Sequence, residues 1–210
     1  MTELEERQGL FLSFAGALGA GLFVWWLMER LGTEFSTTDF VNPESVADIA
    51  ASLPSTEDDF ILSAWDYVAG NIQYQGYSSN LYFVNDAIKC TGCRIPDSTL
   101  KSGKGNCVSM SSVLASILRN RLPPERVFMV VGQMSLDGIG GHAWVNCQRR
   151  DERWYLLEST NPPKGWVPME AVSYIYKPFA YFNDALFYCY SDEICRVKVR
   201  SCDCKRFVLR

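Results

Sequence analysis

The sequence predicts an α+β fold in which helices come first and mainly antiparallel strands follow. Three observations lead to this prediction. Apolar residues recur at helical spacing between residues 43 and 122, strand-like alternation begins at residue 126, and hydrophobic residues make up 48% of the chain. At 210 residues the chain is long enough for one globular domain with a sizeable core and an appendage.

The appendage is the N-terminal segment 1–30, which contains a long uncharged run from Leu10 to Met28. A helix over this run would be roughly 28 Å long, close to the thickness of the hydrocarbon layer of a bilayer. Trp25 and Trp26 lie at its end, and indole rings favour the membrane interface. We therefore expect a transmembrane helix that makes this a single-pass membrane protein, with a buried core helix as the alternative. One arginine flanks each end of the run, so the side of the membrane on which the domain lies stays open.

The region 31–58 is predicted to be an acidic linker with helical content, and the domain itself is predicted to span 59–210. Residues 43–53 have the pattern of a short helix, and Ser55–Asp58 has the composition of a helix N-terminus. The next helix is expected to bury one face, formed by Phe60, Ala64, Tyr67, Val68 and Ile72.

After a loop-rich stretch, 75–106, another helix is predicted to begin at Cys107, with Asn106 as its N-cap. It ends before Pro123. Its buried face is predicted to hold Met110, Val113, Leu114, Ile117 and Leu118. The segments with strand-like alternation that follow are 126–134, 141–148, 153–160 and 194–201.

Cys107 is the first candidate catalytic residue. Free N–H groups and the helix dipole at the start of a helix stabilise negative charge and so favour a thiolate nucleophile. Gly103 and Gly105 precede the cysteine and are expected to leave space for a substrate carbonyl. For Cys107 taken alone, a small buried structural cysteine is the alternative.

His142 is the second candidate, because it is the chain's single histidine and histidine exchanges protons near neutral pH. The polar residues after its strand are typical of a hairpin turn. If that turn centres on Arg150, His142 lies directly opposite Glu158 on the next strand. A carboxylate at that position orients an imidazole and favours its protonated form. A structural histidine and a charge at a strand edge are the alternatives.

A series of motifs runs through the domain in a fixed order. GxGxC stands at a helix start, followed by a leucine-rich helix, a Pro-Pro-Glu-Arg entry into a strand, HAWV and WYLLEST. From about Trp65 to Trp166, this pattern resembles the transglutaminase-like superfamily. The resemblance implies a papain-like core, in which the nucleophile helix packs on an antiparallel sheet. It also implies a triad of Cys107 as nucleophile, His142 as base and Glu158 in the third position.

The family usually has aspartate in the third position, and glutamate is one methylene longer. The orienting hydrogen bond must therefore come from a slightly different backbone position. The resemblance further implies attack of a cysteine thiolate on a peptide or carboxamide carbonyl, which gives an acyl-thioester. Water as the acceptor makes the protein a protease or amidase, which we expect, and an amine makes it a transglutaminase. A catalytically silent domain that binds peptide is a further alternative.

The other cysteines leave three alternatives open. A structural zinc site needs four ligands, which could be the sulfur atoms of Cys90, Cys93, Cys202 and Cys204. Disulfides are favoured if the domain lies outside the cytoplasm, and free thiols are the third alternative. The same question applies to Cys189 and Cys195, whereas Cys147 is expected to point away from the face that carries His142.

No cofactor is expected to be required. A net charge of −4 gives no reason to expect nucleic acid as a partner. The expected partners are a protein or peptide substrate and, through the N-terminal helix, a membrane.

Overall fold

The described part of the chain determines which predictions the structure tests. The computed structural model describes residues 33–76, 80–84, 87–134, 141–160 and 166–189. The chain divides into two compact units, Met1–Thr33 and Glu34–Arg210, and the description below concerns the second. The predicted transmembrane segment Leu10–Met28 and the predicted strand 194–201 lie outside the described residues. Within the ranges given above, no helix is both long enough and apolar enough to cross a membrane.

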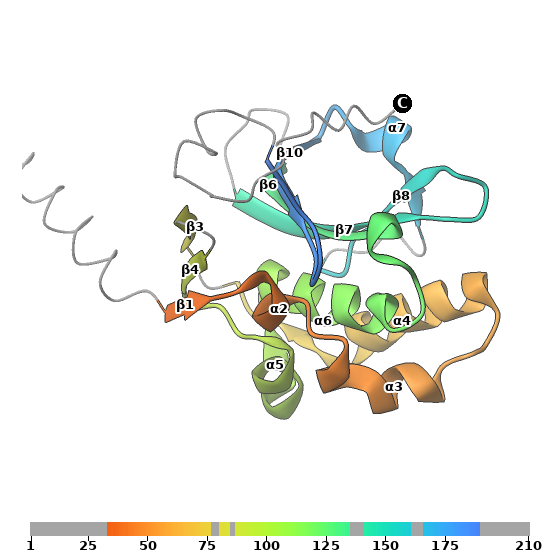
Figure 1. Ribbon diagram of the computed structural model, residues 1–210, viewed down its shortest axis with the longest axis horizontal. Helices are drawn as coiled ribbons and strands as arrows, with labels where there is room; N and C mark the ends of the chain where they lie inside the picture. Colours follow the sequence, from red (N-terminus) through yellow and green to blue (C-terminus); the bar gives the residue numbers. More distant parts are fainter. Residues whose placement is uncertain (1–32, 77–79, 85–86, 135–140, 161–165, 190–210) are drawn as a thin grey trace, which may run out of the picture. The chain divides into compact units, whose positions relative to one another are not determined.

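The order of elements follows the α+β prediction, with most helices before the main sheet (Figure 1). The helical elements are α2 (Thr37–Phe40), η1 (Glu44–Val46), α3 (Ala47–Ser52), α4 (Glu57–Asn71), α5 (Pro96–Ser102), α6 (Cys107–Arg119), η2 (Pro124–Arg126) and α7 (Met169–Val172). The strands are β1 (Thr33–Phe35), β2 (Gln73–Tyr74), β3 (Asn80–Val84), β4 (Ala87–Thr91), β5 (Lys104–Gly105), β6 (Val127–Met134), β7 (Gly141–Gln148), β8 (Trp154–Leu157), β9 (Val167–Pro168), β10 (Tyr176–Phe182) and β11 (Phe187–Cys189).

The main sheet has six strands in the order β11-β10-β6-β7-β8-β9, and all its neighbouring strands are antiparallel. Helix α6 packs on this sheet against β6 and β7 and contacts α4 on another side (Figure 1). A three-stranded sheet (β1-β4-β3) and a parallel pair (β2-β5) complete the described strands. The predicted packing of the Cys107 helix on an antiparallel sheet is therefore confirmed.

Helix α6 is buried on all sides rather than on one face. The predicted apolar face is buried, and so are Ser109, Ser111, Ser112 and Ser116. Two of these serines bond to the chain that precedes α3. The hydroxyl of Ser112 donates to the carbonyl of Phe40, and the N–H of Asn42 donates to Ser116 Oγ at 2.9 Å. Because their side chains are small, these serines let the backbone before α3 approach α6 closely. Their hydroxyls also form hydrogen bonds with the polar groups of that backbone.

The described part of the region 31–58 is mostly helical, as predicted, but it does not behave as a free linker. Its side chains Phe40, Val41, Val46 and Ala50 belong to the same core as α6. At the C-terminal end of α6, Asn120 Nδ2 donates to the carbonyl of Pro43 at 2.9 Å. The segment is thus part of the folded unit, and the proposed boundary at residue 59 stays a prediction.

The hairpin of β7 and β8 has a register that differs from the predicted one by two residues. Asn146 pairs with Leu156, whereas a turn centred on Arg150 would pair it with Trp154. The loop instead contains three residues, Arg150–Glu152, and Glu152 has a φ of 63° in the left-handed region that is typical of such loops. The predicted register was therefore wrong. Because the shift is an even number of residues, every side chain keeps its predicted face.

The sequence pattern does not predict two other regions. The stretch 75–106, expected to be loop-rich, contains the β3–β4 hairpin, α5 and β5. Strand β10 was also not predicted, because the strand contains Pro178 and proline is rare within strands. The register shifts between Pro178 and Ala180, which is where a proline is tolerated within a sheet.

Candidate active site

Cys107 is the first residue of α6, as predicted. The side chain of Asn106 caps the helix by accepting a hydrogen bond from the N–H of Ser109 at 3.1 Å, and its carbonyl accepts from the N–H of Met110 at 2.9 Å. Cys107 is a free, half-buried thiol. The first N–H groups of a helix have no intrahelical partner, and the helix dipole places partial positive charge there. The thiol therefore lies where negative charge is stabilised.

Gly105 has a packing role instead of the predicted substrate-facing role. A Cβ atom at this position would lie 2.8 Å from Ser109 Cβ and 3.3 Å from Thr99 Cγ2. The expected space for a substrate carbonyl is thus filled by protein atoms at this glycine. Its missing side chain lets the segment before Cys107 pack tightly against α5 and α6.

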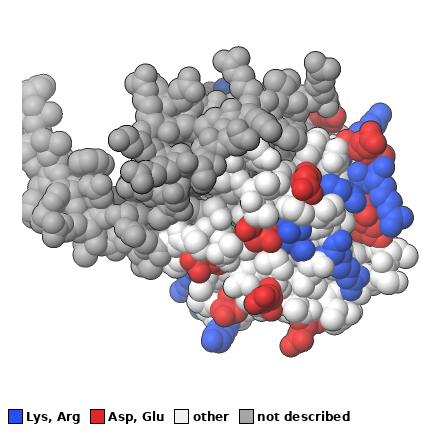
Figure 2. Space-filling view, in the orientation of Figure 1, with Lys and Arg blue, Asp and Glu red and all other residues white. Residues whose placement is uncertain are grey.

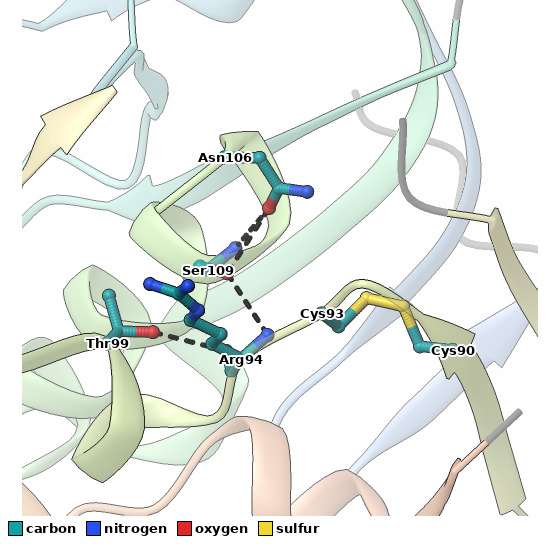
Figure 3. The surroundings of a disulfide bond; sticks show 6 residues. All are labelled: Cys90, Cys93, Arg94, Thr99, Asn106 and Ser109. Carbon is teal, nitrogen blue, oxygen red and sulfur yellow. Dashed lines mark hydrogen bonds between the residues drawn. A yellow bond between two sulfur atoms is a disulfide. The ribbon is translucent and has the colours of Figure 1, made fainter. Parts of the chain in front are cut away.

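A disulfide joins Cys90 and Cys93 close to the start of α6 (Figure 3). The next residue, Arg94, donates its N–H to Ser109 Oγ at 3.2 Å, and Ser109 Oγ in turn donates to Asn106 Oδ1 at 3.2 Å. A chain of hydrogen bonds therefore runs from the disulfide loop to the N-cap of α6.

This disulfide decides between the alternatives for one pair of cysteines. It uses both sulfur atoms that the zinc alternative needs from this part of the chain. Cys202 and Cys204, the other predicted ligands, and Cys195 lie outside the described residues, and nothing is described of the Cys189 side chain. Over the described ranges, no group of three or more His, Cys, Asp or Glu side chains could hold a metal ion.

Cys147 is the other described free thiol, and it is buried. It packs in the core with Ala143 and Val145, whereas Trp144 belongs to a separate cluster, so Cys147 points away from the face of His142 as predicted. Burial raises the pKa of the Cys147 thiol to about 12.

The predicted contact between His142 and Glu158 is confirmed. His142 Nε2 lies 2.7 Å from Glu158 Oε2, and the two residues are only 9% and 2% exposed. Glu158 follows the end of β8, where Val145 pairs with Leu157, so its nearest partner position across the hairpin is Trp144. The carboxylate thus reaches His142 diagonally, over a Cα separation of about 7–8 Å. This longer path gives a physical reason for glutamate in the third position.

Both oxygens of the Glu158 carboxylate accept hydrogen bonds. Oε1 accepts from the N–H of Thr160 at 2.9 Å and from its hydroxyl at 2.7 Å. Oε2 accepts from His142 and, at 3.2 Å, from the hydroxyl of Tyr176. Burial alone raises the pKa of Glu158, but the bonds to His142 and Thr160 outweigh it and the net pKa is lowered. The indole of Trp65 donates to the backbone carbonyl of Glu158 at 2.7 Å, which fixes the chain at this point.

His142 lies between Cys107 and Glu158. Burial lowers the pKa of the imidazole, but its hydrogen bonds to Cys107 and Glu158 and their charges raise it to about 9. Because Nε2 faces Glu158, Nδ1 is left as the ring nitrogen that can bond to Cys107. The structure therefore brings the three predicted residues together, with an imidazolium at neutral pH. Their catalytic role stays a prediction.

Besides Trp65, three described aromatic residues lie near the site and were not among the predicted site residues. The ring of Trp144 stacks on His142 with centroids 6.1 Å apart, and the ring of Tyr176 is 5.2 Å from Trp144. Tyr74 is 48% exposed, and burial together with the charges of Cys107 and Glu158 raises its pKa. Trp144 lies within the HAWV motif and could have been found there. Tyr74 and Tyr176 carry no comparable signal, because strand pairing brings them to the site.

Comparison with known proteins gives similar folds at low sequence identity. LapG of Legionella pneumophila has a TM-score of 0.52 and 13% identity, over 73% of this chain and 87% of that chain. Its EGTA-treated form has a TM-score of 0.52 and 12% identity, over 76% and 88%. A candidate cysteine protease from Cytophaga hutchinsonii has a TM-score of 0.43 and 15% identity, over 73% and 50%. No curated protein sequence matches the chain significantly.

The family assignment comes from the sequence profile of the transglutaminase-like superfamily. This profile matches residues 45–171, more than half of the chain, and the matched range includes all three candidate catalytic residues. The α+β architecture, with helices and an antiparallel sheet, agrees with this match and with the similarity to LapG. The chain belongs to the transglutaminase-like superfamily.

Proposed function

We propose that this protein is a cysteine hydrolase, a protease or amidase, that cleaves peptide or carboxamide bonds through an acyl-thioester on Cys107. The observation that carries the proposal is the buried imidazole of His142, which bonds to Glu158 on one side and has its pKa raised by Cys107 on the other. Membership of the transglutaminase-like superfamily supports the same class of chemistry. The proposal requires no metal or organic cofactor.

In the acylation half of the proposed reaction, the Cys107 thiolate attacks the substrate carbonyl carbon and forms the C–S bond. The carbonyl electron pair moves to the oxygen, which the N–H of Cys107 at the start of α6 is placed to stabilise. As the intermediate collapses, the C–N bond breaks and the His142 imidazolium gives its proton to the leaving nitrogen. Glu158 holds the ring in place and stabilises its protonated form.

In the deacylation half, neutral His142 takes a proton from water while the water oxygen attacks the thioester carbonyl. Collapse breaks the C–S bond, releases the acid product and restores the thiolate and the imidazolium. An amine in place of water would give transglutaminase-type transfer. A silent peptide-binding domain remains the non-enzymatic alternative, and the buried bond between His142 and Glu158 argues against it.

The test compares two thiols of the same chain. Cys107→Ala is expected to abolish cleavage of a casein-derived peptide mixture, and also labelling of the site by iodoacetamide at pH 7. Cys147→Ala removes a buried thiol outside the site. This variant should keep both the cleavage rate and the labelling of the site within about twofold of the wild type. Equal labelling of all thiols, or cleavage that survives Cys107→Ala, contradicts the proposal. Adding a fluorescent primary amine separates the acceptors, since label incorporated into substrate indicates transfer.

We further propose that residues 10–28 anchor the protein in a membrane as a single transmembrane helix. The uncharged run and the tryptophans at its end support this. The full-length protein should stay with the membrane fraction after alkaline carbonate extraction, and deletion of residues 1–30 should release it. Full extraction of the intact chain contradicts the anchor without affecting the proposed chemistry.

A further inference from the structure

Tyr176 lies beside the catalytic pair although nothing in its local sequence indicates it. It is the first residue of β10 and is half-buried. Its hydroxyl donates to Glu158 Oε2 at 3.2 Å, the same oxygen that bonds to His142. Its ring centroid is 6.2 Å from that of His142 and 5.2 Å from that of Trp144. Tyr176 thus contacts the group that orients the imidazole, rather than the nucleophile.

The sheet is built to bring Tyr176 to this place. Gly132 on β6 is the direct partner of His142 on β7, and β6 also pairs with β10. A Cβ atom at Gly132 would lie 2.2 Å from the carbonyl oxygen of Lys177 and 2.7 Å from Trp144 Cη2. The missing side chain therefore lets the start of β10 and the Trp144 ring close over β6, next to His142.

The shared oxygen gives the tyrosine a chemical role. The phenol remains neutral, because burial and the charge of Glu158 raise its pKa, so it is a permanent donor to the carboxylate. A donor on Oε2 restricts rotation of the carboxylate, and it takes up part of the negative charge that otherwise acts on the imidazole. The two effects fix the direction of the Glu158–His142 bond and limit its strength.

We propose that Tyr176 is a positioning residue, whose hydroxyl fixes the Glu158 carboxylate and moderates its pull on His142. The inference rests on the proposed function. Among the described residues, the titratable groups near this pair are Cys107 on α6, Tyr74 on β2 and Tyr176 itself.

The single histidine allows a direct test. In the full-length protein, one imidazole Cε1–H resonance followed by NMR against pH reports His142 without ambiguity. Tyr176→Phe keeps the ring and removes the hydroxyl, so Glu158 Oε2 no longer shares its negative charge between Tyr176 and His142. The midpoint should rise by about half a pH unit.

The matched control is Tyr155→Phe. Tyr155 also donates to a carboxylate, Asp151 Oδ2, at 2.9 Å, but at the turn of the hairpin. Its loss should leave the His142 midpoint unchanged. A Tyr176→Phe titration that coincides with that of the wild type, or that moves to lower pH, overturns the inference.

A double-mutant cycle identifies the route of the effect. If Tyr176 acts through Glu158, the rise should vanish when Tyr176→Phe is made in a Glu158→Gln background. A rise that persists there means that the tyrosine acts on the imidazole directly, and it overturns the positioning role.

Kinetics separate this inference from the proposed function. Tyr176→Phe should lower kcat by about fivefold, with KM unchanged within about twofold. The alkaline limb of its pH–rate profile should move to higher pH. A structural role alone would lower the amount of folded enzyme without moving the limb. If the wild type has no turnover, the proposed function fails while the NMR titration still decides whether Tyr176 acts on the Glu158–His142 pair.

Discussion

The two ends of the β7–β8 hairpin carry the same kinds of interaction in different surroundings. At the turn, Tyr155 bonds to Asp151 at 2.9 Å and Arg149 pairs with Asp58 at 2.5 Å. At the other end, Tyr176 bonds to Glu158 at 3.2 Å and His142 pairs with it at 2.7 Å. The side chain of Asp58 is 51% exposed, whereas that of Glu158 is 1% exposed.

Burial explains why only one end has a candidate chemical role. Ion pairs at a solvated surface contribute about 0–1 kcal/mol, because water and salt screen them. Figure 2 shows basic and acidic side chains intermixed on the right-hand side of the view, where the β7–β8 loop and the start of α4 lie in Figure 1. At the buried end the same kinds of partner, together with Cys107, raise the pKa of His142 to about 9. Because water does not screen these partners, their bonds and charges outweigh the desolvation of His142 and favour its protonated form.

The largest expected effect is that of His142→Ala. The chain has one histidine, so no other imidazole can replace it, and turnover should fall by about 10³-fold or more. Steady-state cleavage of a peptide substrate measures this. Arg149→Ala at the turn is the counterpart, and it should keep kcat within about twofold. Turnover retained by the histidine variant would break the comparison, because neither end would then be catalytic.

The pH dependence of stability should also come from the buried end. The pKa of His142 is about 9 in the folded protein and 6.5 as a reference, so the folded state holds the proton more tightly. The stabilisation is fully present below pH 6.5 and is lost as pH rises through 9, on the order of 3 kcal/mol. Urea denaturation at successive pH values measures it. The slope should persist in Arg149→Ala and disappear in His142→Ala, and a slope in the latter would assign it elsewhere.

Two matched carboxylate variants sharpen the comparison further. Glu158→Gln keeps the shape but removes the charge that favours the imidazolium, so kcat should fall by about 10²-fold, less than for Cys107→Ala. Glu57→Gln loses a pair with Arg126 at the turn end, roughly 20 Å away along β7, and should leave kcat within about twofold. An equal loss in Glu158→Gln and Cys107→Ala would indicate that Glu158 holds the fold. Circular dichroism of both variants checks this.

The smallest expected effect lies in the turn itself. Glu152 has a φ of 63°, which costs a residue with a side chain about 1 kcal/mol relative to glycine. Glu152→Gly should therefore raise the free energy of unfolding by about that amount in urea denaturation, with unchanged turnover. A loss of stability would show that the exposed Glu152 side chain makes a favourable interaction larger than the backbone strain.

Local patterns were sufficient for much of the fold and the site. The N-cap Asn106, the start of α6 at Cys107, the strand Gly141–Gln148 and the face shared by His142 and Glu158 were all predictable. Each depends on neighbours in the chain or on the two-residue period of a strand. The contact between His142 and Glu158 survived a wrong register because an even shift preserves the face and glutamate reaches diagonally.

The sequence by itself determined which residues are candidates for catalysis, because a single imidazole, a thiol at a helix start and a carboxylate on the next strand are local facts. Only the tertiary structure decided what surrounds them. The buried serines of α6, the bond from Trp65 and the approach of Tyr176 all join segments distant in the chain. Contacts of this kind depend on how elements pack, which no local period encodes. The bonds and charges of Glu158 and Cys107 then raise the pKa of His142 against the opposing effect of burial, and the chemistry proposed for the site depends on that pKa.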